Sequence, residues 1–225
     1  MKKNFVFFLL VVFLGNVQAQ GFIKAGWGIR SMHMEALDIV INSYNDSRTW
    51  LDEKMPYINY TNGYSIGFGF MSEKREFSLS HIGNWRTVSA SGIQPANSTF
   101  AQRDLYLRYN QFQMPIIWYP SGGKLGIGAS VDVGYLRFKT KLTGQNEYDA
   151  VQKDLKVGSS LLLKFITSKE KPGLSFTLSL HTPYFATDFY TLDTKLNPVD
   201  SYYTGEKGNP VQIGFTMEYY LIMKN

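Results

Sequence analysis

A two-residue periodicity runs through almost all of this chain after its first twenty residues, and it constrains the fold more than any other feature. In residues 125–135 the apolar or aromatic side chains occupy every second position, and Gly, Ser and Asp occupy the positions between them. Successive side chains of a β-strand point to opposite faces, so this pattern predicts a strand with one apolar and one polar face. The pattern recurs in seven further segments: 23–30, 64–71, 76–86, 111–118, 155–165, 174–181 and 211–221.

The connections between these segments alternate strictly in length. Short connections are expected at 72–75, 120–123 and 168–172, and long ones at 34–61, 88–103, 137–154 and 185–209. This alternation is typical of an eight-stranded antiparallel transmembrane β-barrel with short periplasmic turns and four longer extracellular loops. The aromatic residues near strand ends are then expected to form girdles at the membrane interfaces: Trp27, Trp85, Trp118, Tyr119, Tyr219 and Tyr220. A soluble β-sandwich is the weaker alternative.

The N-terminus carries the features of a secretory signal peptide. Lys2 and Lys3 precede an apolar run at residues 5–14, and Val17-Gln18-Ala19 fits a cleavage site after Ala19. We therefore expect a signal peptide at 1–19 and one barrel domain at 20–225, located in the outer membrane of a Gram-negative bacterium. The signal holds two of the 23 basic residues and none of the 18 acidic ones, which leaves a net charge of +3. That charge gives no reason to expect a nucleic-acid partner.

Charged residues on the polar face predict how the barrel interior is filled. An eight-stranded barrel is only wide enough to hold its own side chains, and charges buried there need partners. Lys24 and Glu218 lie on the first and last strands, Glu76 and Lys164 lie at similar depth, and Asp132 lies near mid-height. We expect these five residues to form an ionic network in the lumen. A small pore or a ligand-binding barrel is the alternative.

Asp132 and two further lumen-facing residues raise the question of catalysis. Asp132, Ser160 and His181 are expected on successive strands at comparable height, which supplies an orienter, a nucleophile and a base in principle. Serine and histidine inside a barrel more often complete hydrogen bonds, and no local motif supports the trio. We therefore expect no enzymatic activity, with a lipid-modifying enzyme as the less favoured alternative. Three scattered histidines and no cysteine also predict no metal site and no cofactor.

The first long connection contains an amphipathic helix by its spacing. Met34, Leu37, Ile41 and Tyr44 recur at helical intervals, Trp50 follows, and Pro56 stops any continuation. The apolar stripe predicts one of three roles: it caps its own barrel, it lies on the outer leaflet, or it docks a protein partner. The docking candidates are Leu37, Ile41, Tyr44 and Trp50.

Two adjacent segments resemble a known family. Residues 109–119, Tyr-Asn-Gln-Phe-Gln-Met-Pro-Ile-Ile-Trp-Tyr, are similar to the Tyr-Leu-Glu-Ile-Pro-Leu-Leu segment of the Bacteroidota outer-membrane β-barrel family, with Gln113 in place of the usual Glu. Residues 126–135 resemble the glycine-alternating strand that follows it. The resemblance implies a small barrel of the OmpX-like or PorT-like kind. Together these features predict a non-enzymatic interaction or accessory subunit of an outer-membrane assembly, with secretion or gliding as the loosest analogy, and with membrane lipid and a protein as partners.

Overall fold

The computed structural model describes residues 19–199, 205, 207–208 and 211–223. The predicted signal peptide lies outside the described residues except for Ala19. None of the helices in the described part has the length and apolar character needed to span a bilayer.

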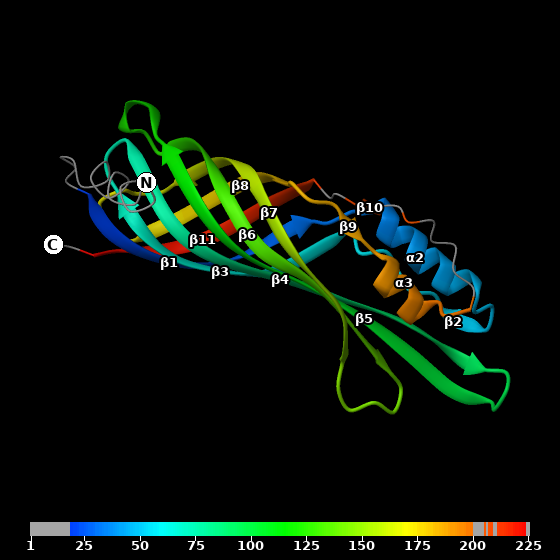
Figure 1. The fold of residues 1–225 in the computed structure, drawn as a ribbon. Helices are drawn as coiled ribbons and strands as arrows, with labels where there is room; N and C mark the ends of the chain where they lie inside the picture. Colours follow the sequence, from blue (N-terminus) through cyan, green and yellow to red (C-terminus); the bar gives the residue numbers. More distant parts are fainter. Residues whose placement is uncertain (1–18, 200–204, 206, 209–210, 224–225) are drawn as a thin grey trace.

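The architecture is all-β, as predicted, and eight of its strands close into a ring (Figure 1). These strands are β1 (Gln20–Ser31), β3 (Tyr60–Met71), β4 (Arg75–Gln94), β5 (Thr99–Trp118), β6 (Leu125–Leu142), β7 (Asp149–Ile166), β8 (Gly173–Pro183) and β11 (Gln212–Met223). Their order is β4-β3-β1-β11-β8-β7-β6-β5, and pairing of β5 with β4 completes the ring. Every pairing around the ring is antiparallel, and the first strand meets the last from Gly21↔Met223 to Arg30↔Gly214.

Glycines on the inward face allow these strands to approach one another closely. A Cβ added at Gly26 would lie 2.0 Å from the carbonyl oxygen of Met217, and one at Gly63 would lie 1.7 Å from that of Gly83. Any side chain at either position would therefore push neighbouring strands apart. This explains why the polar face of the alternation contains so much glycine.

Two of the four expected long loops are mostly strand. β4 continues to Gln94 and β5 begins at Thr99, while β6 continues to Leu142 and β7 begins at Asp149. The predicted loops at 88–103 and 137–154 were therefore wrong, and only residues 95–98 and 143–148 connect the strands. The alternation continues through both segments, but with its apolar residues on the opposite face. The β4–β5 and β6–β7 hairpins consequently extend well past the ring (Figure 1).

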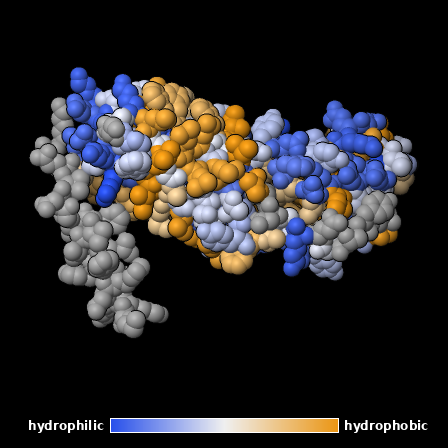
Figure 2. Space-filling view, turned by 90° about the horizontal axis from the view of Figure 1, so that it is seen from above, coloured by the Kyte–Doolittle hydropathy of each residue, from blue (hydrophilic) through white to orange (hydrophobic). Residues whose placement is uncertain are grey.

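The outward face of the ring is apolar. On β5 the side chains of Phe112, Met114, Ile116 and Trp118 are 53, 40, 57 and 50% exposed. We call the zone covered by such side chains on all eight strands the apolar belt. Figure 2 shows hydrophobic residues gathered over the barrel strands and hydrophilic residues toward both ends. Of the predicted girdle residues, Trp27, Trp85, Trp118 and Tyr219 are exposed. The prediction was wrong for Tyr119 and Tyr220, whose side chains point inward and are buried.

Beyond the belt, the end opposite the short turns is closed by a folded cap. It contains α2 (Glu35–Asp46), α3 (Tyr190–Leu196), β2 (Leu51–Glu53), the small sheet of β9 (Thr187–Asp188) and β10 (Lys207–Gly208), and the parts of β4, β5, β6 and β7 that extend past the ring. The predicted helix in the first connection is confirmed as α2. Its apolar stripe packs with α3 and with the inward faces of the long hairpins in one hydrophobic core (Figure 1).

This core decides where the docking candidates lie. Leu37 and Ile41 are completely buried and Tyr44 is 3% exposed, all within contacts of their own chain. These three side chains are therefore not an exposed apolar stripe, because packing in the cap core already removes them from water. Only Trp50, which is half-buried, reaches the surface.

Candidate functional site

Two buried ion pairs occupy the lumen near the short turns. Lys24 Nζ lies 3.1 Å from Glu218 Oε2, and Lys164 Nζ donates to both oxygens of Glu76 at 2.7 and 2.9 Å. The carboxylates accept additional hydrogen bonds, at 2.6 Å from the Ser65 hydroxyl and 2.6 Å from the Tyr119 hydroxyl. Each buried charge thus has a counter-ion, and each carboxylate also accepts a hydrogen bond from a hydroxyl, which is what a low-dielectric interior requires.

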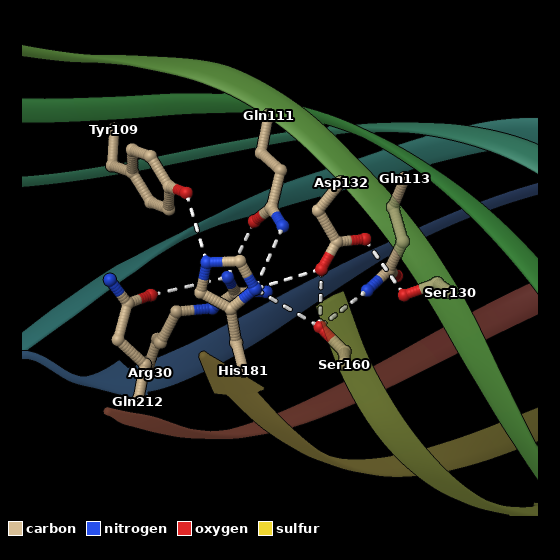
Figure 3. A network of polar contacts seen from close by, with 9 residues as sticks. All are labelled: Arg30, Tyr109, Gln111, Gln113, Ser130, Asp132, Ser160, His181 and Gln212. Carbon is tan, nitrogen blue, oxygen red and sulfur yellow. Dashed lines mark hydrogen bonds and ion pairs between the residues drawn. The ribbon is translucent and has the colours of Figure 1, made fainter. Parts of the chain in front are cut away.

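Asp132, the fifth residue of the predicted ionic network, lies apart from these pairs. It belongs to a separate network at mid-lumen, shown in Figure 3. Its carboxylate accepts from Ser130 Oγ at 2.7 Å, from Ser160 Oγ through a short hydrogen bond, and lies 2.8 Å from His181 Nδ1. The strand register explains the grouping, because Ser130 pairs with Ser160 and Ser160 pairs with His181 across adjacent strands.

The mid-lumen network extends across the barrel through residues that the sequence did not single out. The Tyr109 hydroxyl lies 3.2 Å from His181 Nε2, and Gln111 Nε2 lies 3.5 Å from His181 Nδ1. Arg30 Nη1 donates to Gln111 Oε1 at 2.5 Å and to Gln212 Oε1 at 3.3 Å. Arg30 and Gln111 lie on β1 and β5, which are not neighbours in the ring, so no alternation pattern predicts their contact (Figure 3).

The geometry of Asp132, Ser160 and His181 differs from that of a catalytic relay. In a Ser-His-Asp triad the serine and the carboxylate bind different nitrogens of the imidazole. Here Ser160 Oγ, at 3.1 Å, and Asp132 Oδ2, at 2.8 Å, both face Nδ1. One nitrogen cannot accept the serine proton while donating to the carboxylate. Ser160 is 2% exposed and His181 fully buried, so the trio also has no open face toward a substrate.

Apolar layers close the lumen at both ends of these networks. At the turn end a buried cluster contains Phe22, Met71, Ile117, Tyr119, Leu162, Ile166 and Tyr220. At the opposite end lies the core of the cap. Between them a cavity of about 20 Å³ borders Lys24, Arg30 and Glu218, which is room for about one water molecule. The described lumen therefore contains side chains rather than a continuous bore.

Two arginines, Arg48 just after α2 and Arg103 on β5, reach the C-terminal end of α3. Arg48 Nη2 donates to the carbonyl of Leu196 at 2.8 Å, and Arg103 Nη1 donates to that of Lys195 at 3.2 Å. Both guanidinium groups lie over the Tyr44 ring, at 4.0 and 5.7 Å from its centroid. They satisfy carbonyls that a helix end leaves without partners. Burial lowers the pKa of the Arg103 guanidinium from its ordinary value of 12.5 and raises the pKa of the Tyr44 phenol.

Trp50 borders a pocket beside this arginine pair. The pocket is also lined by Tyr44, Arg48, Gln94 and Arg103. Both terminal nitrogens of the Arg48 guanidinium group donate hydrogen bonds to oxygen atoms of this chain. The arrangement is thus explained by helix capping. Across the residues that the structure describes, no three His, Asp or Glu side chains gather in a metal-binding group.

No family model matches this chain, and no curated protein matches it. Among solved structures it is similar to the crystal structure of Ail, the attachment invasion locus protein of Yersinia pestis, in complex with the heparin analogue sucrose octasulfate. The two are 8% identical, with a TM-score of 0.45 over 92% of this chain and 99% of that one. The resemblance of residues 109–119 and 126–135 to the Bacteroidota barrel family stays a prediction.

Proposed function

We propose that this chain is a small, non-enzymatic outer-membrane β-barrel that serves as an interaction or accessory subunit. The observation that carries the membrane assignment is the exchange of polarity along the strands. On β5 the outward residues Phe112, Met114 and Ile116 are apolar and exposed, whereas Tyr106 and Arg108, further along the same face, are polar. An exposed apolar zone of this extent is unfavourable in water and matches the lipid-facing band of a transmembrane barrel.

Labelling of intact cells tests the orientation of this barrel. A cysteine at Asn97 or Gln145, on the tips of the long hairpins, should react with a membrane-impermeant maleimide. A cysteine at Lys74, in a short turn, should react only after the cells are opened. Reaction at Lys74 alone would reverse the orientation, and equal labelling of a protein that needs no detergent would exclude the membrane assignment. Asn197 is unsuitable for this test because its side chain is 3% exposed.

An interaction role is supported by apolar residues that the cap leaves in water. Ile93 and Phe100 are cross-strand partners near the tip of the β4–β5 hairpin, and they are 56 and 58% exposed. The tip of this hairpin lies far beyond the ring (Figure 1), so lipid does not reach the pair in the proposed membrane position. Exposed apolar side chains on a water-facing hairpin are characteristic of protein-binding surfaces. We therefore place the partner contact on this hairpin tip rather than on α2.

Replacement of Ile93 and Phe100 by serine tests this contact. Proteins that co-purify with the wild-type chain after mild detergent extraction should be lost from the variant. A matched control replaces Tyr190 and Val199, which are 64 and 87% exposed elsewhere on the cap, by serine. The control should retain the partner, and both variants should keep the heat-modifiable gel mobility of a folded barrel. Retention by the tip variant would contradict the proposed contact.

A pore is the second candidate function, and the filled lumen disfavours it. Planar-bilayer recordings of the purified protein should show no large and stable conductance, because the ion pairs and the apolar layers occupy the space within the strands. A steady open channel would promote the pore over the interaction role. Hydrolysis of a lipid that stops in the Ser160→Ala variant would likewise overturn the non-enzymatic proposal.

A further inference from the structure

A row of three cations lies on the outward face of three adjacent strands. Arg108 on β5 is the direct cross-strand partner of Arg137 on β6, and Arg137 is the partner of Lys153 on β7. Their chain neighbours Leu107, Tyr109, Leu136 and Phe138 are buried inward, so alternation directs the cations outward. We call Arg108, Arg137 and Lys153 the cation row.

The row follows the edge of the apolar belt. The next outward pair toward the barrel is Tyr135 and Leu155, which are 45 and 54% exposed. Two of the cations bend back toward that edge. Lys153 Nζ lies 4.2 Å from the centroid of the Tyr135 ring, and Arg108 Nε donates to Asn110 Oδ1 at 3.0 Å. Long cationic side chains that keep their stems along apolar surface place their charges at the lipid headgroup level.

Nothing in the described part of the chain neutralises this row. No ion pair joins any of the three cations to a carboxylate there. Like charges placed directly opposite each other on neighbouring strands are destabilising. At the turn end, by contrast, Lys169 lies among its own chain's groups, donating to the carbonyls of Glu73 and Gly122. The row therefore leaves its positive charge free to attract anions from outside the chain.

We infer that the cation row binds phosphate groups on the lipid headgroups of the outer leaflet. Arg108 and Arg137 supply planar guanidinium donors suited to phosphate oxygens, and Lys153 adds a point charge. Because the three residues are cross-strand partners on adjacent strands, their charges lie side by side along the membrane edge, where they can contact neighbouring headgroups. This inference rests on the proposed membrane insertion and adds a lipid class to it.

The test compares binding of two glycolipids to the protein in detergent micelles by native mass spectrometry. The probes are diphosphorylated lipid A and its dephosphorylated form. Wild-type protein should bind the phosphorylated lipid at least about tenfold more tightly, because each basic residue near a lipid surface attracts its anionic headgroups. The triple variant Arg108→Gln, Arg137→Gln, Lys153→Gln should lose that preference.

A matched control removes the same charge elsewhere on the cap. The variant Lys54→Gln, Lys195→Gln, Lys207→Gln should keep the preference. Equal binding of both lipids by wild-type protein, or an unchanged preference in the triple variant, would overturn the inference. Displacement of the lipid by excess inorganic phosphate would assign the row to free phosphate instead, which also overturns it. A failure to insert into vesicles would refute the proposed function separately, because insertion does not depend on the probe's phosphates.

Discussion

The barrel and the cap are built from the same strands with opposite interiors. Along the inward face of β5, Gln111 and Gln113 lie inside the apolar belt, whereas Leu105 and Leu107 lie beyond it. The outward face changes in the reverse sense, from Phe112 to Arg108. The strand itself does not change direction or break between these regions. What changes along the strand is the medium that we infer outside it, which is lipid at the belt and water at the cap.

The comparison shows how each region is stabilised. The cap follows the rule of soluble proteins, in which apolar side chains leave water for a core and each fully buried one contributes about 1.5–3 kcal/mol. Inside the belt most apolar side chains face outward, so much of the interior between the apolar layers is occupied by polar groups. These must satisfy one another, as Lys24 with Glu218 and Lys164 with Glu76 do. Variants that respect this difference should behave differently in the two regions.

The largest effect is expected from breaking a lumen ion pair. Lys164→Met leaves the fully buried Glu76 carboxylate without its counter-ion, which should destabilise the barrel by about 3–5 kcal/mol. Urea unfolding in lipid vesicles measures this change. The double variant Glu76→Leu, Lys164→Met removes both charges and should be close to neutral. If the single variant is as stable as the double variant, the lumen is hydrated rather than closed.

In the cap, removing apolar volume should be the damaging change. Leu37→Ala deletes a completely buried side chain and should cost about 2–5 kcal/mol. The loss should appear as faster hydrogen exchange in α2, while the barrel strands keep their protection. The control Asn42→Ala, at an exposed position of the same helix, should leave exchange nearly unchanged. Unchanged protection in Leu37→Ala would contradict the packing of α2 against the cap core.

A charge placed on the outward face should distinguish the two surroundings directly. Ile116→Arg puts a charge in the apolar belt and should destabilise the inserted barrel by about 2–4 kcal/mol. Thr87→Arg puts the same charge on the outward face of β4 beyond the belt, where the change should be within about 0.5 kcal/mol. Equal effects at the two positions, measured by unfolding in vesicles, would remove the distinction on which the comparison depends.

The smallest effect concerns the pH dependence of the cap. Burial raises the pKa of the Asp38 carboxyl above its ordinary 3.8, although His33, 3.4 Å away, acts in the opposite direction. A carboxyl whose pKa is higher in the folded state stabilises that state below its unfolded pKa, and the contribution is lost as pH rises through the folded pKa. Hydrogen exchange of α2 should therefore slow slightly as pH falls through this range, after correction for intrinsic rates. Asp38→Asn should remove that part of the dependence, and an identical dependence in both proteins would contradict it.

The alternation predicts much of the barrel because one rule holds through most of the belt, with Ile82, Ile117 and Leu162 as apolar residues that face inward. Residues 125–135 sit where apolar side chains face outward and polar ones inward, and seven other segments obey the same rule. The rule fails beyond the belt, where we infer that the outward face meets water instead of lipid. Beyond the belt, Val88 and Leu105 face inward. A prediction that expects apolar residues on the outward face therefore takes these strand segments for loops. The spacing of Leu37 and Ile41 predicts a helix correctly, but three environments could cover its stripe and spacing does not choose among them.

The lumen contacts depend on which strands face each other across the barrel. Opposite charges at similar depth suggest pairing for Glu76 with Lys164, and the structure places them in contact. Asp132 fits that reasoning equally well, yet its neighbours across β7 and β8 are Ser160 and His181. Arg30 meets Gln111 across the lumen, a contact that depends on the barrel's width and stagger rather than on any local pattern.

A spin-label scan along the outward face of β5 tests the exchange of polarity most directly. Single labels replace Asp104, Tyr106, Arg108, Asn110, Phe112, Met114 and Ile116 in protein reconstituted into vesicles, and collision rates are measured with oxygen and with a water-soluble nickel chelate. Labels at 112, 114 and 116 should collide mainly with oxygen, which concentrates in lipid. Those at 104, 106 and 108 should collide mainly with the chelate, with the change near Asn110. Chelate access along the whole face, or oxygen preference continuing past Arg108, would contradict the account.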